Sequence, residues 1–179
     1  MKKIPTIFVR NPENMKELLN KQHPECSWVF EGEGIPTRKY DGTCCKVEDG
    51  KLFKRREIKK GKLVPNEFVQ EQLDNITGKR VGWMPVNCQD LQDKYHCAAF
   101  DGQPDGTYEL CGPKIQGNPE RFDKHVLISH AKAFVFDYCP TNYKEIKVWL
   151  LLCPGEGVVW HHRSDRRMAK IKKRDFNMN

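Results

Sequence analysis

The residues best suited to chemistry lie in the hexapeptide Arg38-Lys39-Tyr40-Asp41-Gly42-Thr43. A lysine amine that has lost its proton is a nucleophile and can form covalent intermediates. Asp41 adds a carboxylate that can hold a cation near a phosphate, and Gly42 lets the chain turn tightly and approach a ligand. The pattern is short, and an ordinary surface hairpin turn has the same composition. The rest of the chain has to decide between these two interpretations.

The elements around the lysine are expected to be strands. Residues 44–47 and 51–57 flank Glu48-Asp49-Gly50, a sequence typical of a hairpin turn. This predicts a hairpin with Lys39 at its head and a basic second arm. The basic run continues to Lys62, and such a run is usually a solvated face.

A second hairpin is predicted over residues 156–173 near the end of the chain. Alternation along its second arm places Lys170 and Lys172 on one face, and Ile171 and Lys173 on the other. Asn11-Pro12 is typical of a helix start, with an asparagine cap and a proline in the first turn. Further strands are expected over 7–9, 28–30, 82–86, 108–111, 126–128 and 133–137, a helix over 142–149, and a short helix or irregular segment over 68–76.

The length and the charge of the chain limit the number of domains and the kinds of partner to be expected. The chain has 179 residues, enough for one domain with a hydrophobic core, and shows no repeat or low-complexity linker. It is 31% charged and carries a formal net charge of +7. A basic domain often binds nucleic acid or nucleotide phosphates, and a role in solubility alone is the alternative.

The eight cysteines contain no Cys-x-x-Cys pair, which argues against a zinc knuckle. His125 and His130 have no familiar ligand spacing, so we expect them at polar surface positions. No signal peptide opens the chain and no apolar stretch is long enough to span a bilayer. We therefore expect reduced, mostly buried thiols in a cytoplasmic protein that has no membrane partner.

Several short motifs occur in the order found in covalent nucleotidyltransferases. Lys39-Tyr40-Asp41-Gly42 resembles motif I, Tyr108-Glu109-Leu110 motif III, Glu156-Gly157-Val158-Val159 motif IV, and Lys170-Ile171-Lys172 motif V. Residues 134–137 resemble the aromatic segment between motifs III and IV. DNA ligases and many capping enzymes have an arginine five residues after the lysine, where this chain has Cys44. From about residue 34 to 176, the chain is similar to the small 5′-to-3′ RNA ligase family known from vertebrates.

The resemblance implies an α+β nucleotidyltransferase (adenylation) domain of antiparallel sheets flanked by helices. A single domain would cover residues 1–179, with the nucleotide in the cleft between sheets and no separate C-terminal OB-fold. The implied activity is that of an ATP-dependent RNA ligase. Such an enzyme joins RNA 5′-phosphate and 3′-hydroxyl ends through a lysyl-AMP intermediate and an adenylylated RNA 5′ end. A GTP-dependent mRNA capping guanylyltransferase and a non-catalytic RNA-binding module of the same fold are the alternatives.

The resemblance also implies residue roles. Lys39 would carry AMP, and its amine would be freed by burial and by neighbouring cations, which lower a lysine pKa from its ordinary ~10.4. Phe134 would stack on adenine, although a place in the core is the alternative. The expected ligands of Mg²⁺ or Mn²⁺ are Asp41, Glu109 and Glu156, with ribose binding by Glu109 or surface salt bridges as alternatives. The expected nucleotide-binding set is Lys39, Arg55, Glu109, Phe134, Glu156, Lys170 and Lys172.

Overall fold

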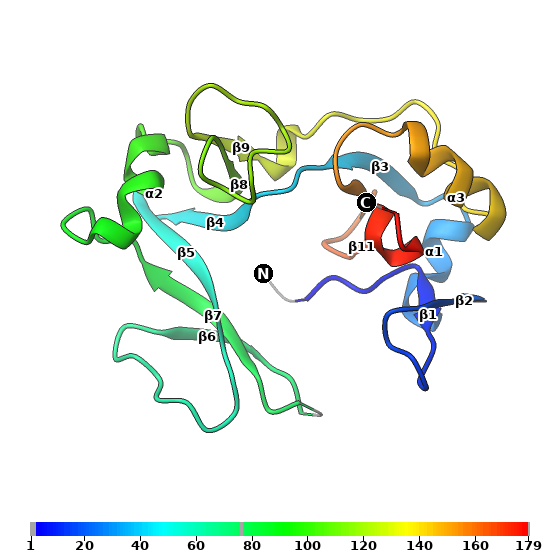
Figure 1. Ribbon diagram of the computed structural model, residues 1–179, viewed down its shortest axis with the longest axis horizontal. Coiled ribbons are helices and arrows are strands. Elements are labelled where there is room, and N and C mark those ends of the chain that lie inside the picture. The colour runs from blue at the N-terminus through cyan, green and yellow to red at the C-terminus, as the bar shows by residue number, and fades with distance from the viewer. Residues whose placement is uncertain (1–2, 76, 179) are drawn as a thin grey trace. The chain divides into compact units, whose positions relative to one another are not determined.

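The computed structural model describes residues 3–75 and 77–178, and its fold is α+β with antiparallel sheets and few helices, as predicted (Figure 1). The chain divides into two compact units. Unit 1 comprises Met1–Lys3 and Asp41–Lys132, and unit 2 comprises Ile4–Tyr40 and Ala133–Asn179. In the described ranges, no helix combines the length and the apolar character that crossing a membrane requires. One adenylation domain over residues 1–179 stays a prediction.

Unit 2 contains a three-stranded sheet in the order β11-β10-β3 and a two-stranded sheet of β1 and β2. Its elements are β1 (Phe8–Arg10), β2 (Leu18–Gln22), η1 (Pro24–Cys26), α1 (Ser27–Phe30), β3 (Gly34–Lys39), α3 (Tyr143–Leu152), β10 (Gly157–His162), β11 (Met168–Lys172) and η4 (Lys173–Phe176). Alternate residues of β10 and β11, among them Val158, Trp160 and Ile171, are buried in a core that also includes Ile146 and Leu150 of α3. The opposite face of the sheet is thus left for polar side chains.

Unit 1 contains a six-stranded antiparallel sheet in the order β6-β7-β5-β4-β8-β9. Its elements are β4 (Thr43–Glu48), β5 (Lys51–Ile58), β6 (Val69–Leu73), β7 (Arg80–Pro85), η2 (Leu91–Asp93), α2 (Lys94–Ala99), β8 (Gly106–Cys111), β9 (Val126–Ser129) and η3 (His130–Lys132). One face buries Cys45, Leu52, Tyr108 and Leu110 together with Ala99 of α2. Directly opposite residues of antiparallel strands share a face, so the register separates this core face from a second face.

The hairpin predictions are confirmed, but the position predicted for Lys39 is wrong. β4 and β5 pair around Asp49 and Gly50, and β10 pairs with β11. Lys39 is not at the head of the first hairpin, because it ends a separate strand, β3, that pairs with β10. Lys173 is the first residue of η4, so strand alternation does not extend to it.

The helix predicted from Asn11 is wrong, because asparagine side chains close turns there. The Asn11 carboxamide oxygen accepts from the amide of Glu13, and that of Asn14 accepts from the amide of Lys16. Side-chain bonds of this kind compete with helical backbone bonds. The segment therefore forms the loop between β1 and β2, and Leu18 begins a strand.

Three shorter predictions are also wrong. Residues 28–30 lie in α1 instead of a strand, and residues 69–73 form β6 instead of a helix or irregular segment; Ile76, at the end of that predicted segment, lies outside the described residues. Residues 133–137 form no strand and make one isolated bridge, Thr37 with Val135. Short apolar runs carry too few residues for their periodicity to separate helix from strand. The strands expected near 7–9 and over 82–86, 108–111 and 126–128, and the helix over 142–149, are confirmed.

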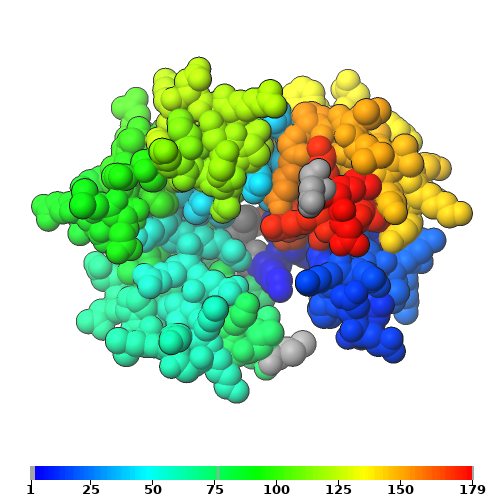
Figure 2. Space-filling model, viewed as in Figure 1, coloured from blue at the N-terminus to red at the C-terminus, as the bar shows by residue number. Residues whose placement is uncertain are grey.

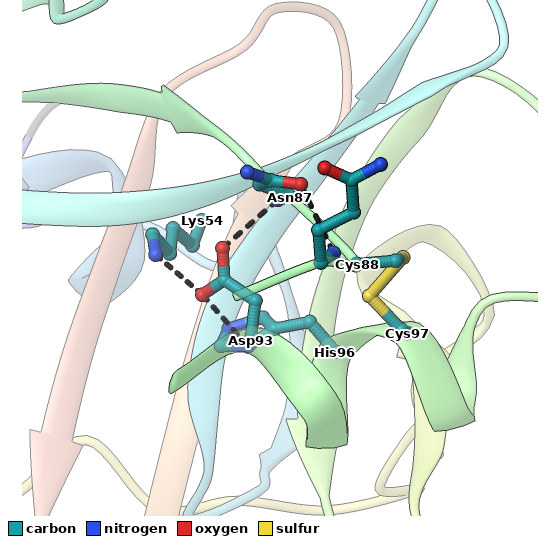
Figure 3. Close-up of a disulfide and its surroundings, with 7 residues drawn as sticks. Lys54, Asn87, Cys88, Asp93, His96 and Cys97 are labelled. Atoms are coloured by element: carbon teal, nitrogen blue, oxygen red, sulfur yellow. Dashed lines mark hydrogen bonds and ion pairs between the residues drawn. A yellow bond between two sulfur atoms is a disulfide. The ribbon is translucent and has the colours of Figure 1, made fainter. Parts of the chain in front are cut away.

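The expectation that all the cysteines are reduced is wrong for Cys88 and Cys97, which form a disulfide with 5.7 Å between their Cα atoms (Figure 3). The loop after β7 is held against α2, since the Asp93 carboxylate accepts from the Asn87 amide and from Lys54 of β5. These contacts bring the two cysteines together across nine residues. Elsewhere, burial raises the pKa of the Cys26 and Cys153 thiols to about 11, so both remain protonated.

Candidate active site

Three lysines predicted for the site share one face of the sheet in unit 2. Gly157 of β10 lies directly opposite Lys39 of β3 on one side and Lys172 of β11 on the other. Lys170 lies two residues before Lys172 along β11, and therefore points to the same side. We call Lys39, Lys170 and Lys172 the lysine face. The predicted alternation, with Ile171 buried on the opposite face, is confirmed.

Gly157 keeps the centre of the lysine face free of a side chain. A Cβ atom built at this position would lie 2.2 Å from the Ile171 carbonyl oxygen and 2.8 Å from the Lys172 Cα atom. Any other residue would therefore push β10 away from β11. The glycine allows the three strands to stay close while the lysines on either side flank an open backbone position.

Glu156 is the carboxylate at this face. Glu156 Oε2 lies 2.5 Å from Lys39 Nζ. Its Oε1 lies 3.5 Å from Lys172 Nζ and 3.3 Å from an Arg174 guanidinium nitrogen. Burial by itself would raise the pKa of Glu156, but the positive charges of Lys39, Lys172 and Arg174 together hold it below its ordinary value. Glu156 is therefore ionised at neutral pH and fixes the position of the Lys39 amine.

The lysine face carries more positive charge than Glu156 can balance. Burial, together with the charges of Lys172 and Lys39, lowers the pKa of Lys170 to about 8. Burial also lowers the pKa of Lys172, against the opposing effect of Glu156 and Asp175. Crowded, partly desolvated cations of this kind are stabilised by an anion that arrives between them.

The end of β11 is fixed by η4. The Asp175 carboxylate accepts from the Lys172 backbone amide at 2.9 Å, and its other oxygen lies 2.5 Å from an Arg10 guanidinium nitrogen. Asp175 is buried, so it ties η4 and β1 to the strand that carries the two lysines. The Lys173 backbone amide donates to the Glu156 carbonyl at 3.0 Å, and its carbonyl accepts from the Met178 amide at 3.2 Å.

Phe134 lies next to β3 in unit 2. Its carbonyl oxygen accepts from the Arg38 amide at 2.7 Å, so its backbone is beside the residue that precedes Lys39. The side chain is 58% exposed, which excludes a place in the core. Its ring meets the edge of the Phe136 ring at 5.4 Å between centroids. An exposed, supported aromatic ring is suited to stack on a base.

Unit 1 holds Glu109 on β8. One of its carboxylate oxygens accepts from the Gly42 amide at 3.1 Å, and the other lies 3.1 Å from His130 Nε2. A Cβ atom on Gly42 would lie 2.2 Å from the Leu110 carbonyl oxygen, so only glycine fits against β8 here. His130, expected at a polar surface position, is half-buried and pairs with Glu109.

Arg55 and Glu109 share the second face of the six-stranded sheet. Cys44 lies opposite Glu109, and the neighbouring pair of Cys45 with Lys54 belongs to the core face. Cys44 precedes Cys45 and Arg55 follows Lys54, so both point away from the core face, to the same side as Glu109. The Arg55 Nε atom is buried and has no hydrogen-bond partner among the described residues. Unit 1 thus brings two of the predicted nucleotide-binding residues to one face.

Asp41 is the first residue of the main stretch of unit 1, two residues after Lys39 in the chain. Its backbone amide donates to a Glu120 carboxylate oxygen at 3.1 Å. Sequence reasoning missed Glu120, His130 and Arg174 as partners of motif residues. Their partners are distant in the chain, and a single sequence contains no signal for such pairs.

Among the residues that the structure describes, no group of three or more histidine, cysteine, aspartate or glutamate side chains is arranged to hold a metal ion. The donor chemistry nevertheless suits Mg²⁺, because this ion binds through one or two carboxylates and completes its shell with water and substrate phosphates. The predicted ligands are Asp41 and Glu109 in unit 1 and Glu156 in unit 2, and metal binding by any of them stays a prediction. The chain matches no protein-family model and no curated protein sequence.

Proposed function

We propose that the chain is an ATP-dependent RNA ligase that carries AMP on Lys39. The observation that supports this most is the lysine face, in which Lys39, Lys170 and Lys172 surround a glycine and one ionised glutamate. Its surplus of positive charge suits a polyphosphate. A solvated set of lysines would not be packed around a half-buried carboxylate in this way.

In the first step, the Lys39 ammonium group gives a proton to water, its free Nζ lone pair forms a bond to the α-phosphorus of ATP, and the nitrogen then loses a second proton to water. The bond from that phosphorus to the bridging oxygen breaks, and pyrophosphate leaves with the electron pair. Glu156 holds the amine in position, and Lys170 and Lys172 stabilise the charge that builds up on the α-phosphate. An amine is suited to this task because a phosphorus–nitrogen bond is stable enough to persist and labile enough to transfer.

In the later steps, an RNA 5′-phosphate oxygen takes AMP from Lys39 and releases the amine. A 3′-hydroxyl group then gives its proton to water as its oxygen bonds to the RNA 5′-phosphorus, and AMP leaves with the electron pair of the broken phosphorus–oxygen bond. A Mg²⁺ or Mn²⁺ ion held by Asp41, Glu109 or Glu156 would neutralise phosphate charge. The same proposal includes stacking of adenine on Phe134, contacts of Arg55 and Glu109 with the nucleotide, and a nucleotide cleft between sheets.

The test is to incubate the protein with ATP or GTP and Mg²⁺, and to measure the intact mass at neutral pH, because phosphoramidates are labile in acid. Addition of AMP from ATP supports the ligase proposal. Addition of GMP from GTP would instead identify a capping guanylyltransferase, and no addition from either would favour a binding module. Sealing of 5′-phosphorylated RNA, in parallel with pre-adenylylated RNA, then separates the first step from the joining step.

A further inference from the structure

Unit 1 carries a cluster of exposed cations that the proposed lysine chemistry does not use. We call Arg56, Lys59, Lys60, Lys62 and Arg80 the basic edge; all of them are exposed. Arg56 lies near the end of β5. Arg80 is the first residue of β7 and pairs with Ile58, which follows Arg56 by two residues in β5. The three lysines follow β5 directly in the chain. The register of β5 and β7 thus gathers distant parts of the sequence at one end of the sheet (Figure 1).

The basic edge is not neutralised by carboxylates. Two nearby cations do have partners: Lys79 Nζ lies 2.9 Å from Glu57, and Lys54 pairs with the buried Asp93. For the members of the basic edge, no ion pair is found within residues 3–75 and 77–178. Glu57 and Asp93 are therefore paired with other cations, and the side chains of the basic edge are exposed to solvent.

The turn that bears the lysines is part of the packed structure. The Lys62 amide donates to the Lys59 carbonyl at 3.1 Å, and Gly61 between them has a φ of +78°. A Cβ atom on Gly78 would lie 2.8 Å from Lys60 Cδ, so the Lys60 stem lies against the chain just before β7. In the space-filling view, the cyan-to-green segment that connects β5 to β7 forms part of the surface (Figure 2). The charges are thus held by a defined scaffold.

We propose that the basic edge binds the sugar–phosphate backbone of the RNA substrate. Exposed lysines and arginines without carboxylate partners bind phosphates and release counterions, which gives affinity without sequence preference. That the nucleic acid is RNA rests on the proposed ligase function. An anionic membrane is the competing occupant, but membrane-binding segments combine basic charge with a broad apolar face. Only one large apolar side chain, Leu63, accompanies the lysines in this turn.

The experiment compares two triple variants that lose the same net charge. One carries Lys59→Ala, Lys60→Ala and Lys62→Ala; the matched control carries Lys16→Ala, Lys144→Ala and Lys147→Ala, all exposed residues of unit 2. Binding of a short single-stranded RNA with a 5′-phosphate is followed by fluorescence anisotropy over a range of salt concentrations. Each lost phosphate contact lowers the slope of log affinity against log salt by about 0.7, so the first variant should lose about 2 from the slope. The control should keep the wild-type slope.

Equal slopes in the two variants, or a wild-type slope in the first, would overturn the proposal. A third variant with arginine at positions 59, 60 and 62 keeps the charge and should keep the slope, which shows that the turn itself is tolerant. Loss of binding to phosphatidylserine vesicles with an unchanged RNA slope would also overturn it, in favour of a membrane. AMP uptake by the wild-type protein is measured separately. If the wild type takes up no AMP, but the first variant still has a lower slope than the wild type, the ligase proposal is refuted and the basic edge remains a nucleic-acid surface.

Discussion

Two buried or half-buried lysine environments in this chain differ in their charge balance. On the core face of unit 1, Lys54 pairs with one carboxylate, Asp93, which also accepts from the Asn87 amide (Figure 3). Burial alone would raise the pKa of Asp93, but these bonds hold it below its ordinary value. On the lysine face of unit 2, several cations share Glu156, and the pKa values of Lys170 and Lys172 fall. A matched pair stabilises a fold, whereas a surplus of cations leaves a place for an anion.

The largest effect should come from Lys39. Lys39→Ala removes the amine, so uptake of AMP should fall from a full equivalent to none, measured as intact mass under neutral conditions. Lys39→Arg keeps a positive charge beside Glu156 and should be equally inactive, since a guanidinium is a poor nucleophile at neutral pH. A gain of AMP mass by either variant would contradict the assignment.

Removal of metal tests whether the lysine face suffices alone. We expect EDTA to stop AMP uptake and added Mg²⁺ to restore it, because Mg²⁺ neutralises triphosphate charge that the lysines only partly balance. The assay is the same mass measurement with and without chelator. Full uptake in EDTA would show that the cationic face needs no metal.

Replacement of the other two lysines should reduce the rate without abolishing it. Lys170→Ala and Lys172→Ala each remove a charge aimed at the developing negative charge, which costs about 2.7–4 kcal/mol of transition-state stabilisation, or about 10²–10³ in kcat. Lys173→Ala is the control, because Lys173 lies in η4 and contacts Glu156 through its backbone amide, which the substitution keeps. Sealing rates of 5′-phosphorylated RNA provide the readout, and a control variant as slow as the other two would refute the assigned roles.

The matched pair should respond in the opposite way. Asp93→Ala leaves Lys54 without its carboxylate, and breaking a buried pair costs about 3 kcal/mol in the free energy of unfolding. Lys170→Met removes a crowded charge and should leave stability unchanged or higher at pH 7. Urea unfolding of both variants without reductant, so that the Cys88–Cys97 disulfide stays closed, measures the contrast. Loss of stability in Lys170→Met equal to that in Asp93→Ala would erase the distinction.

The smallest effect concerns pH. The folded-state pKa of Lys170, about 8, is below the ordinary value of ~10.4, so the unfolded chain binds more protons between these values. The free energy of unfolding should therefore receive a rising contribution from Lys170 as pH increases through that window. Lys170→Met should lose this contribution. Urea unfolding at several pH values within the window checks the difference, and parallel curves for the two proteins would contradict it.

The sequence predicted the parts of this structure whose signals are local. The β4–β5 and β10–β11 hairpins follow from turn residues and strand alternation, which also place Lys170 and Lys172 on one face. Asn142 was predicted to begin a helix, and its side chain does cap α3. In contrast, asparagine near the N-terminus closes turns, because its side chain bonds neighbouring amides.

Side-chain pairs between different elements could not be predicted from the sequence. The bond between Glu109 and His130, the contact of Arg174 with Glu156 and the pair of Lys54 with Asp93 each depend on how strands and loops come together. The disulfide belongs to the same class, since the spacing of Cys88 and Cys97 matched no known pattern. The motifs supplied the candidate site residues, whose roles stay a prediction, but they did not supply partners such as His130 and Arg174.

The interrupted course of unit 2 has a consequence for the order in which the chain folds during synthesis. The main stretch of unit 1 is continuous, whereas unit 2 needs residues from both sides of it. β3 pairs with β10 in the sheet and bridges to Val135, both from the second segment, and Lys39 and Glu156 are 117 residues apart. Contacts between distant segments form late, and a ribosome supplies the second segment last. The Lys39 amine therefore has no Glu156 partner on the nascent chain until the segment around residue 156 has been made.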